Sequence, residues 1–176
     1  GPHFEGFRSE MAYPLILDMS IHHIDLLRYL LDTDVAAVQA VSVDAPWNWN
    51  KGASTVMAQL ELENGVAAGY LGSWVSQGWE TNWNADWRFE GSEGVLMVEN
   101  DEVFFSNTPG RRRRVPLAKC AREQQAWLLD AFAKALNTRT EPETSARNSL
   151  NSLAATHAVV CAAKEKRRVT IREMLE

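Results

Sequence analysis

Two aspartates and two adjacent histidines interrupt the apolar run LILDMSIHHIDLLRYLL, residues 15–31. Buried ionisable groups cost free energy unless they are paired, so such a run needs either a wet face or a chemical task for these groups. An imidazole beside a carboxylate can take a proton from a substrate hydroxyl near neutral pH, because the carboxylate orients the ring and favours its protonated form. Asp18 and His22 are therefore the candidate catalytic pair.

A helix must position these groups, and its period of about 100° per residue separates the two histidines. His22 falls on the same arc as Asp18 and Asp25, whereas His23 falls among the leucines and isoleucines. We expect a helix that begins at Asp18 or the next residue, with Asp18 as its N-cap, His22 on the polar face and His23 toward the core. In the alternative interpretation the polar groups are structural: Asp18 only caps the helix and Asp25 pairs with Arg28.

The middle of the chain alternates apolar and polar residues, which predicts β-strands. Residues 54–63 carry a regular apolar face, and Asn64-Gly65 is a strong hairpin signal. Further strands are expected at 37–45, 66–76, 85–91, 94–100, 102–107, 112–117 and 167–171. Because successive strands are joined by short turns, their pairing should be antiparallel.

Helical spacing returns near the end of the chain, in two segments around 128–136 and 150–161 that are separated by a loop at 138–145. His157 lies on the apolar stripe of the second segment, which predicts a core position. The order of the elements predicts an α+β fold, an open and mainly antiparallel sheet with helices packed on one face. We expect residues 1–14 to be an irregular N-terminal segment and residues 15–176 to form a single domain.

The composition of the chain argues against several classes of function. The chain has 176 residues, 45% hydrophobic and 23% charged, with a net charge of −5, which fits a globular domain and does not indicate a nucleic-acid surface. No apolar run is long enough to span a bilayer, and the chain starts without a secretory signal. Cys120 and Cys161 stand alone, without metal-binding or redox spacing. We expect a cytoplasmic protein without a metal site or membrane partner.

Tryptophan is unusually frequent, with seven residues, and several lie in the segments PWNWN and GWETNWNADW. Aromatic rings stack on the apolar faces of sugars, and amide side chains hydrogen-bond hydroxyl groups. Trp79, Trp83 and Asn84 are therefore candidate substrate-binding residues for a carbohydrate or polyol. The alternative is that these large amphipathic residues serve packing.

The segment Asp18-Met19-Ser20-Ile21-His22-His23-Ile24-Asp25 resembles the motif Asp-x-Gly-x-His-x-x-Asp of the Gfo/Idh/MocA oxidoreductases, named for glucose–fructose oxidoreductase and inositol dehydrogenase. The resemblance continues in order along nearly the whole chain. It includes LELENGVAAGYLGSW, WRFEGSEGVLMVEND, EQQAWLLDAFAKAL and ATHAVVCAAKEKRRVTI, which resemble the strands, hairpins and last helices of the family's C-terminal domain.

The resemblance implies the family's C-terminal domain without its Rossmann domain, because the sequence has no GxGxxG turn and no Glu-Lys-Pro segment. It also implies that His22 is the acid/base on the hydroxyl being oxidised and that Asp18 orients it or shares its proton. Asp25 would be mainly structural. Ser20 stands where the family motif has Gly.

The family's pattern sets further expectations about partners. The parent protein, meaning the longer protein that would contain this domain, would use NAD or NADP. This chain would bind no cofactor and should be inactive by itself. The substrate would be a sugar, a polyol or a related small molecule. Copies of the chain would associate through the face of the sheet and form a homo-oligomer.

Two other functions stay open at this point. The chain could be a non-catalytic ligand-binding or oligomerisation module, because the nucleotide-binding half is missing. It could also be a metal-dependent hydrolase in which Asp18, His22 and a distant His or Glu hold the ion.

Overall fold

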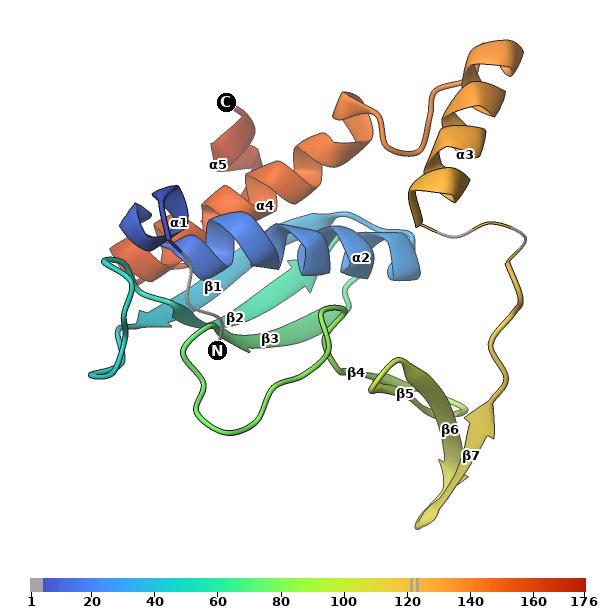
Figure 1. The fold of residues 1–176 in the computed structure, drawn as a ribbon, viewed down its shortest axis with the longest axis horizontal. Helices are drawn as coiled ribbons and strands as arrows, with labels where there is room; N and C mark the ends of the chain where they lie inside the picture. Colours follow the sequence, from blue (N-terminus) through green and yellow to red (C-terminus); the bar gives the residue numbers. More distant parts are fainter. Residues whose placement is uncertain (1–4, 121, 123) are drawn as a thin grey trace. The chain divides into compact units, whose positions relative to one another are not determined.

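The computed structural model describes residues 5–120, 122 and 124–176. These residues form an α+β fold, as predicted, and Figure 1 shows the order of its elements. The described residues divide into two compact units, one made of the chain up to Gly78 together with Thr144–Glu176, and the other of Trp79–Glu143. Every strand pair in the described chain is antiparallel, also as predicted.

The first unit is built on a sheet with the strand order β3-β2-β1-β8. Its strands are β1 (Val35–Val43), β2 (Thr55–Leu62), β3 (Ala67–Ser73) and β8 (Val169–Thr170). The alternation in β2 places its apolar side chains on one buried face, as the sequence predicts; they are Val56, Ala58, Leu60 and Leu62. The Asn64-Gly65 turn joins β2 to β3, where Gly65 has the positive φ of 83° that such a turn requires.

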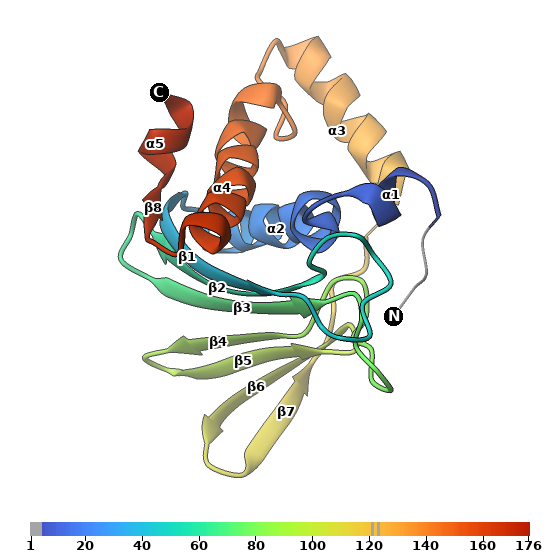
Figure 2. The same ribbon diagram turned by 90° about the vertical axis from the view of Figure 1, so that its left-hand side faces the viewer.

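Helices cover that buried face of the sheet (Figures 1 and 2). The helix α4 (Ala146–Glu165) packs on β1 and against α2 (Ile21–Leu31). Small residues of α4 allow the close approach; the fully or nearly fully buried ones are Ser152, Ala154, Ala155, Ala158 and Ala162. The short helix α5 (Ile171–Leu175) follows β8 and also contacts α4. His157 of α4 is exposed, so the predicted core position is wrong.

The first helix begins earlier than predicted. A π-helix η1 (Ile16–Ser20) precedes α2, and Leu17 N already donates to Tyr13 O at 3.1 Å. Asp18 therefore lies inside a helical turn, and the expected N-cap role is wrong. Pro14 occupies the start of this helical region, where its missing N–H breaks no hydrogen bond.

The sequence predicts an irregular segment over 1–14, of which residues 1–4 lie outside the described residues. Residues Phe7–Glu10 form one helical turn, α1. The loop that joins β1 to β2 lies against it: Lys51 N donates to Ser9 O at 2.9 Å. Gly52 approaches the backbone after α1 so closely that a Cβ there would lie 2.1 Å from Ala12 O.

That close approach makes Gly52→Ala a destabilising change. A backbone oxygen cannot move aside as a flexible side chain can, so we expect the free energy of unfolding to fall by about 1–3 kcal/mol, the usual cost of overpacking. Urea denaturation measures this loss. Gly69→Ala is the matched control, because a Cβ at Gly69 meets nothing within 4 Å. Equal stability of the two variants would show that the loop does not hold this position in solution.

The second unit contains a sheet with the order β4-β5-β6-β7. Its strands are β4 (Trp87–Gly91), β5 (Gly94–Glu99), β6 (Glu102–Thr108) and β7 (Arg111–Val115). The edge strand β7 carries four consecutive arginines, and contacts with other side chains of the sheet are made by Arg112, Arg113 and Arg114. Arg112 pairs with Glu99 at 2.6 Å and lies over Phe104, and Arg114 pairs with Glu102 at 2.6 Å. Charged side chains on an edge strand oppose edge-to-edge pairing with other chains.

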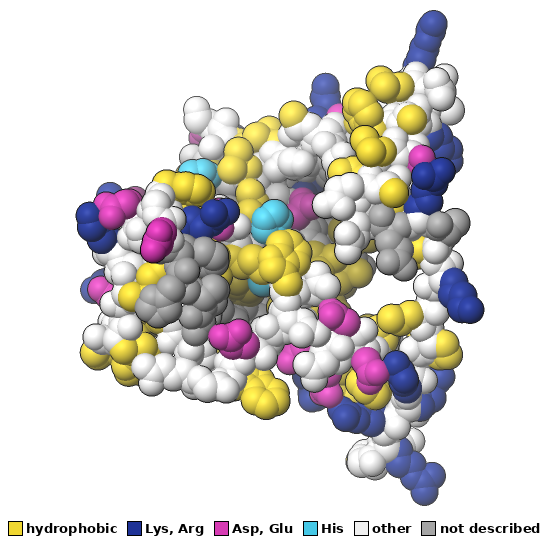
Figure 3. All heavy atoms as spheres, viewed as in Figure 1, with side chains coloured by type: hydrophobic (Ala, Val, Ile, Leu, Met, Phe, Trp, Pro, Cys, Tyr) yellow, Lys and Arg dark blue, Asp and Glu magenta, His cyan; other side chains and the backbone are white. Residues whose placement is uncertain are grey.

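The helix α3 (Gln124–Thr138) belongs to the same unit and exposes apolar side chains along its length (Figure 3). These are Trp127, Leu128, Leu129, Phe132 and Leu136. Such a stripe on a surface is typical of a helix that packs against another surface.

Candidate active site

Asp18 and His22 lie one helical turn apart, where η1 continues into α2. His22 is exposed, whereas His23 is 8% exposed, as the helical wheel predicts. The side chain of Asp18 is 24% exposed. A π-helical turn inside an α-helix is uncommon and is frequent at functional sites, because it changes the direction of the side chains that follow it.

Asp18 has an ionic partner that the sequence analysis did not identify. Arg8 Nε, from α1, donates to Asp18 Oδ2 at 2.7 Å. This hydrogen bond raises the pKa of the Arg8 guanidinium, although burial acts in the opposite direction. The candidate carboxylate therefore lies beside a fixed positive charge.

A buried polar cluster lies beneath the same turn. Ser20 Oγ lies 3.0 Å from Tyr70 Oη, and His23 Nδ1 lies 3.1 Å from the same phenolic oxygen. Burial raises the pKa of the Tyr70 phenol, although the hydrogen bond with Ser20 lowers it, so Tyr70 stays protonated at neutral pH. Gly72 leaves room for this phenol, because a Cβ there would lie 2.8 Å from Tyr70 Oη. The cluster ties the start of α2 to β3 and holds His23 on the inner side.

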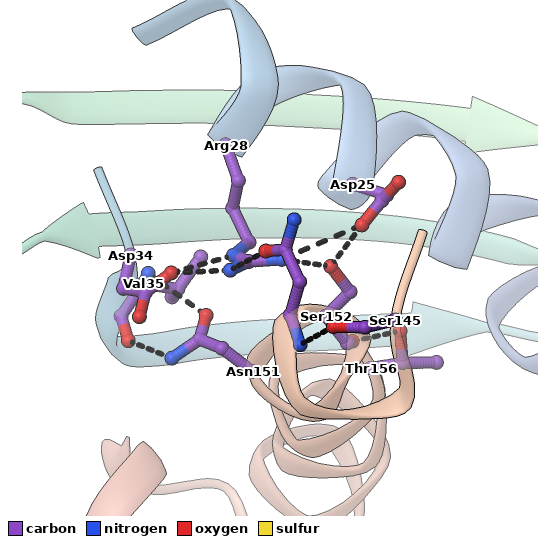
Figure 4. A network of polar contacts seen from close by, with 9 residues as sticks. Asp25, Arg28, Asp34, Val35, Ser145, Asn151, Ser152 and Thr156 are labelled. Carbon is purple, nitrogen blue, oxygen red and sulfur yellow. Dashed lines mark hydrogen bonds and ion pairs between the residues drawn. The ribbon is translucent and has the colours of Figure 1, made fainter. Parts of the chain in front are cut away.

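A second polar network fixes the far end of α2 (Figure 4). Arg28 Nε donates to Asp34 Oδ1 at 2.8 Å, and Arg28 Nη1 donates to Ser152 Oγ of α4 at 2.6 Å. Arg28 Nη1 also lies 3.4 Å from Asp25 Oδ1, to which Ser152 donates. The alternative, structural interpretation predicts this pairing of Asp25 with Arg28, which the structure confirms, and Asp25 contributes to the contact between α2 and α4.

The candidate substrate-binding residues belong to the other unit. Trp79 and Trp83 are exposed, at 75% and 62%, so they do not fill a core in the described chain. Asn84 Nδ2 donates to Asp101 Oδ1 at 3.1 Å, and Asn82 Nδ2 donates to the other oxygen of that carboxylate at 2.8 Å. The structure thus brings Asp18 and His22 together in the first unit and places Trp79, Trp83 and Asn84 in the second.

The sequence lacks the glycine-rich turn of a Rossmann-type dinucleotide site. Phosphates of NAD and NADP are held where a glycine-rich turn joins a parallel strand to a helix. The strand pairs described here are all antiparallel, and the sequence has no GxGxxG turn. Within the described ranges, no group of three or more His, Cys, Asp or Glu side chains is placed to hold a metal ion.

Arg8, Ser20 and Tyr70 are the site residues that sequence analysis missed. Tyr70 had one signal, because the alternation in β3 places it on the inward face, and a buried tyrosine hydroxyl usually has a hydrogen-bond partner. Its partners Ser20 and His23 are 50 and 47 residues away in the chain. No sequence pattern indicates a role for Arg8, since it lies in a segment without hydrophobic periodicity.

The fold and the site together define the class of protein. It is an α+β domain in which the helix formed by η1 and α2 presents an aspartate and a histidine in the spacing Asp-x-x-x-His. The chain belongs to the Gfo/Idh/MocA family, because residues 8–171 match the model described as "Oxidoreductase family, C-terminal alpha/beta domain". None of the helices in the described residues combines the length and hydropathy needed to cross a membrane.

Curated relatives are about twice as long as this chain. It is 28% identical to the 1,5-anhydro-D-fructose reductase of Ensifer adhaerens over 172 residues, which cover 92% of this chain and 50% of the reductase. It is 23% identical to the uncharacterized protein y4oX of Sinorhizobium fredii over 181 residues, which cover 97% of this chain and 50% of that protein. The chain therefore spans about half the length of these relatives.

Solved structures share the fold. The aldose-aldose oxidoreductase of Caulobacter crescentus matches with a TM-score of 0.76 and 20% identity, over 88% of this chain and 47% of the other. An oxidoreductase of Agrobacterium radiobacter, solved with NAD+, L-tartaric acid and magnesium, matches with a TM-score of 0.79 and 20% identity, over 96% and 52% of the two chains. At these identities the similarity shows the fold alone.

Proposed function

We propose that this chain is the substrate-binding and catalytic C-terminal domain of an NAD(P)-dependent oxidoreductase that acts on a sugar, a polyol or a related hydroxyl compound. The parent protein, meaning the full gene product that contains these residues, would bind NAD or NADP through residues outside the described chain. We place this protein in the cytoplasm, in keeping with its two free cysteines.

The observation that carries the proposal is the difference in exposure between the two adjacent histidines. His22 is exposed one turn after Asp18, whereas His23 is held inside by Tyr70. An exposed imidazole on a rigid helix can exchange a proton with a bound hydroxyl, because its helix is fixed at both ends by the Tyr70 cluster and the Arg28 network. His22 would take the proton of the hydroxyl during oxidation and return it during reduction, with Asp18 orienting the imidazole.

The chemical class of the substrate rests on relatives and on exposed side chains. Two of the similar proteins, an aldose-aldose oxidoreductase and a 1,5-anhydro-D-fructose reductase, are named for carbohydrates. Trp79 and Trp83 present exposed aromatic rings on which a sugar face can stack. Trp79, Trp83 and Asn84 are proposed as substrate contacts on this basis.

The proposal is tested by assaying the parent protein with NAD+ and NADP+ against D-glucose and myo-inositol, and with NADH and NADPH against 1,5-anhydro-D-fructose. We expect cofactor turnover with at least one compound, followed by absorbance at the nicotinamide band. A parent protein that turns over neither cofactor would favour the non-catalytic module. Zinc-dependent hydrolysis that a chelator abolishes would favour the metal-dependent hydrolase.

The chain by itself is expected to bind neither NAD nor NADP appreciably, because it lacks a phosphate-binding turn. Isothermal titration calorimetry of the 176-residue chain checks this expectation. The parent protein is the positive control. Saturable binding of either dinucleotide to the chain at micromolar affinity would contradict the expectation.

Self-association through the outward face of the β3-β2-β1-β8 sheet is also proposed. Apolar side chains remain exposed on it, among them Val41, Met57 and Leu71, the last at 73%. We expect light scattering to show an oligomer that Leu71→Glu converts to a smaller species, because a charge at the centre of an apolar contact cannot be paired. Leu175→Glu, at an exposed position of α5, is the control, and a wild-type monomer at high concentration would contradict the proposal.

A further inference from the structure

Arg8 is joined to the candidate catalytic carboxylate and yet comes from a separate element. Its Nε atom lies 2.7 Å from Asp18 Oδ2, and the two side chains are 38% and 24% exposed. Ten residues separate them in the chain, and Pro14 lies between them. Neighbouring positions on one helix cannot produce this contact, so it depends on where α1 is held.

The β1–β2 loop holds α1 in place. Lys51 N donates to Ser9 O at 2.9 Å, and Lys51 Nζ pairs with Glu10 at the end of the same helical turn. Gly52 lies directly against the backbone carbonyls of Met11 and Ala12. These contacts hold the helical turn that carries Arg8, so its guanidinium restricts the side-chain rotation of Asp18.

We propose that Arg8 is a positioning residue: it fixes the Asp18 carboxylate in the orientation that lets Asp18 align the imidazole of His22. This inference rests on the proposed function. Arg8 itself need not touch the substrate. Its removal should therefore slow the chemical step more than it weakens substrate binding, because the catalytic groups lose their alignment.

The ion pair can be tested in the 176-residue chain without a substrate. Aspartate labelled with 13C at the side-chain carboxyl carbon gives a signal for Asp18 that reports on its surroundings. In Arg8→Ala we expect this signal to move, and added guanidinium chloride at millimolar concentration to return it toward the wild-type position. Amide signals of Val38 and Leu60, in the core of the first unit, report whether the variant is folded.

Arg88→Ala is the matched control. Arg88 also forms an ion pair through Nε, with Glu90 at 2.8 Å, but it belongs to the second unit. This variant should leave the Asp18 signal unchanged. An Asp18 signal that is the same in the wild type and in folded Arg8→Ala would overturn the proposal.

Kinetics of the parent protein separate this inference from the proposed function. Arg8→Ala should lower kcat by about 10²-fold, the scale of a misplaced catalytic group, with KM near the wild-type value and partial recovery of kcat in guanidinium. Arg88→Ala should keep the wild-type kcat. If His22→Ala is inactive while Arg8→Ala keeps full kcat, the proposed function stands and the positioning role is overturned. If His22→Ala keeps full activity, the proposed function fails, whereas the carboxyl signal still decides whether the ion pair forms.

Discussion

Replacing His22 with alanine in the parent protein should lower kcat by about 10²–10⁴-fold, the usual loss when a general acid or base is removed. The exposed position of His22 makes this a test of chemistry, because the side chain contributes little to the core. Steady-state kinetics with saturating cofactor measure the change. Thermal unfolding should show that the variant keeps the stability of the wild type.

His23→Ala is the control that the sequence itself supplies, since it changes the adjacent histidine. His23 is buried and contacts Tyr70, so its loss should lower the free energy of unfolding by about 1–3 kcal/mol, the cost of disturbing a buried hydrogen bond. The folded fraction should keep most of its kcat. A large loss of kcat in His23→Ala together with full activity in His22→Ala would reverse the two assignments.

Arg28→Met should lower the free energy of unfolding by about 3 kcal/mol, at the low end of the range for removing one partner of a buried ion pair. The Arg28 side chain is 10% exposed, and its loss leaves Asp25 and Asp34 without their shared cation. The cost stays at the low end because both carboxylates are partly exposed and can be hydrated. Urea denaturation followed by circular dichroism measures it.

A matched control for Arg28 is Arg88→Met, which breaks an ion pair between two well-exposed side chains. Exposed pairs contribute at most about 1 kcal/mol, so this variant should unfold close to the wild type. If both variants lost the same stability, the network of α2 and α4 would not hold the two helices together as described.

Local signals in the sequence account for the strands and their pairing. The alternation in 54–63 correctly assigns the buried face of β2, and Asn64-Gly65 correctly places the first hairpin turn. Both features depend on residues that are close in the chain, where side-chain period and turn chemistry act directly. The division of the strands between two sheets depends on long-range packing, and no local pattern reports it.

The helix that carries Asp18 and His22 likewise shows what local sequence patterns can predict and what they cannot. Its wheel correctly separates exposed His22 from buried His23, because the period of the helix decides this. The helix starts earlier than the sequence predicts, because Asp18 is a residue type favoured at N-caps but lies within η1. The contacts of Tyr70 and Arg8 join distant segments and could not be read from spacing.

The most direct test of the central claim is chemical rescue of His22→Ala by imidazole in the parent protein. If His22 transfers the proton, added imidazole should restore kcat in a saturable manner, and substituted imidazoles should restore it in proportion to their basicity. His23→Ala should show no such response. A folded His22→Ala variant that is fully active without imidazole, or that stays inactive at every imidazole concentration, would contradict the assignment of His22 as the acid/base of this domain.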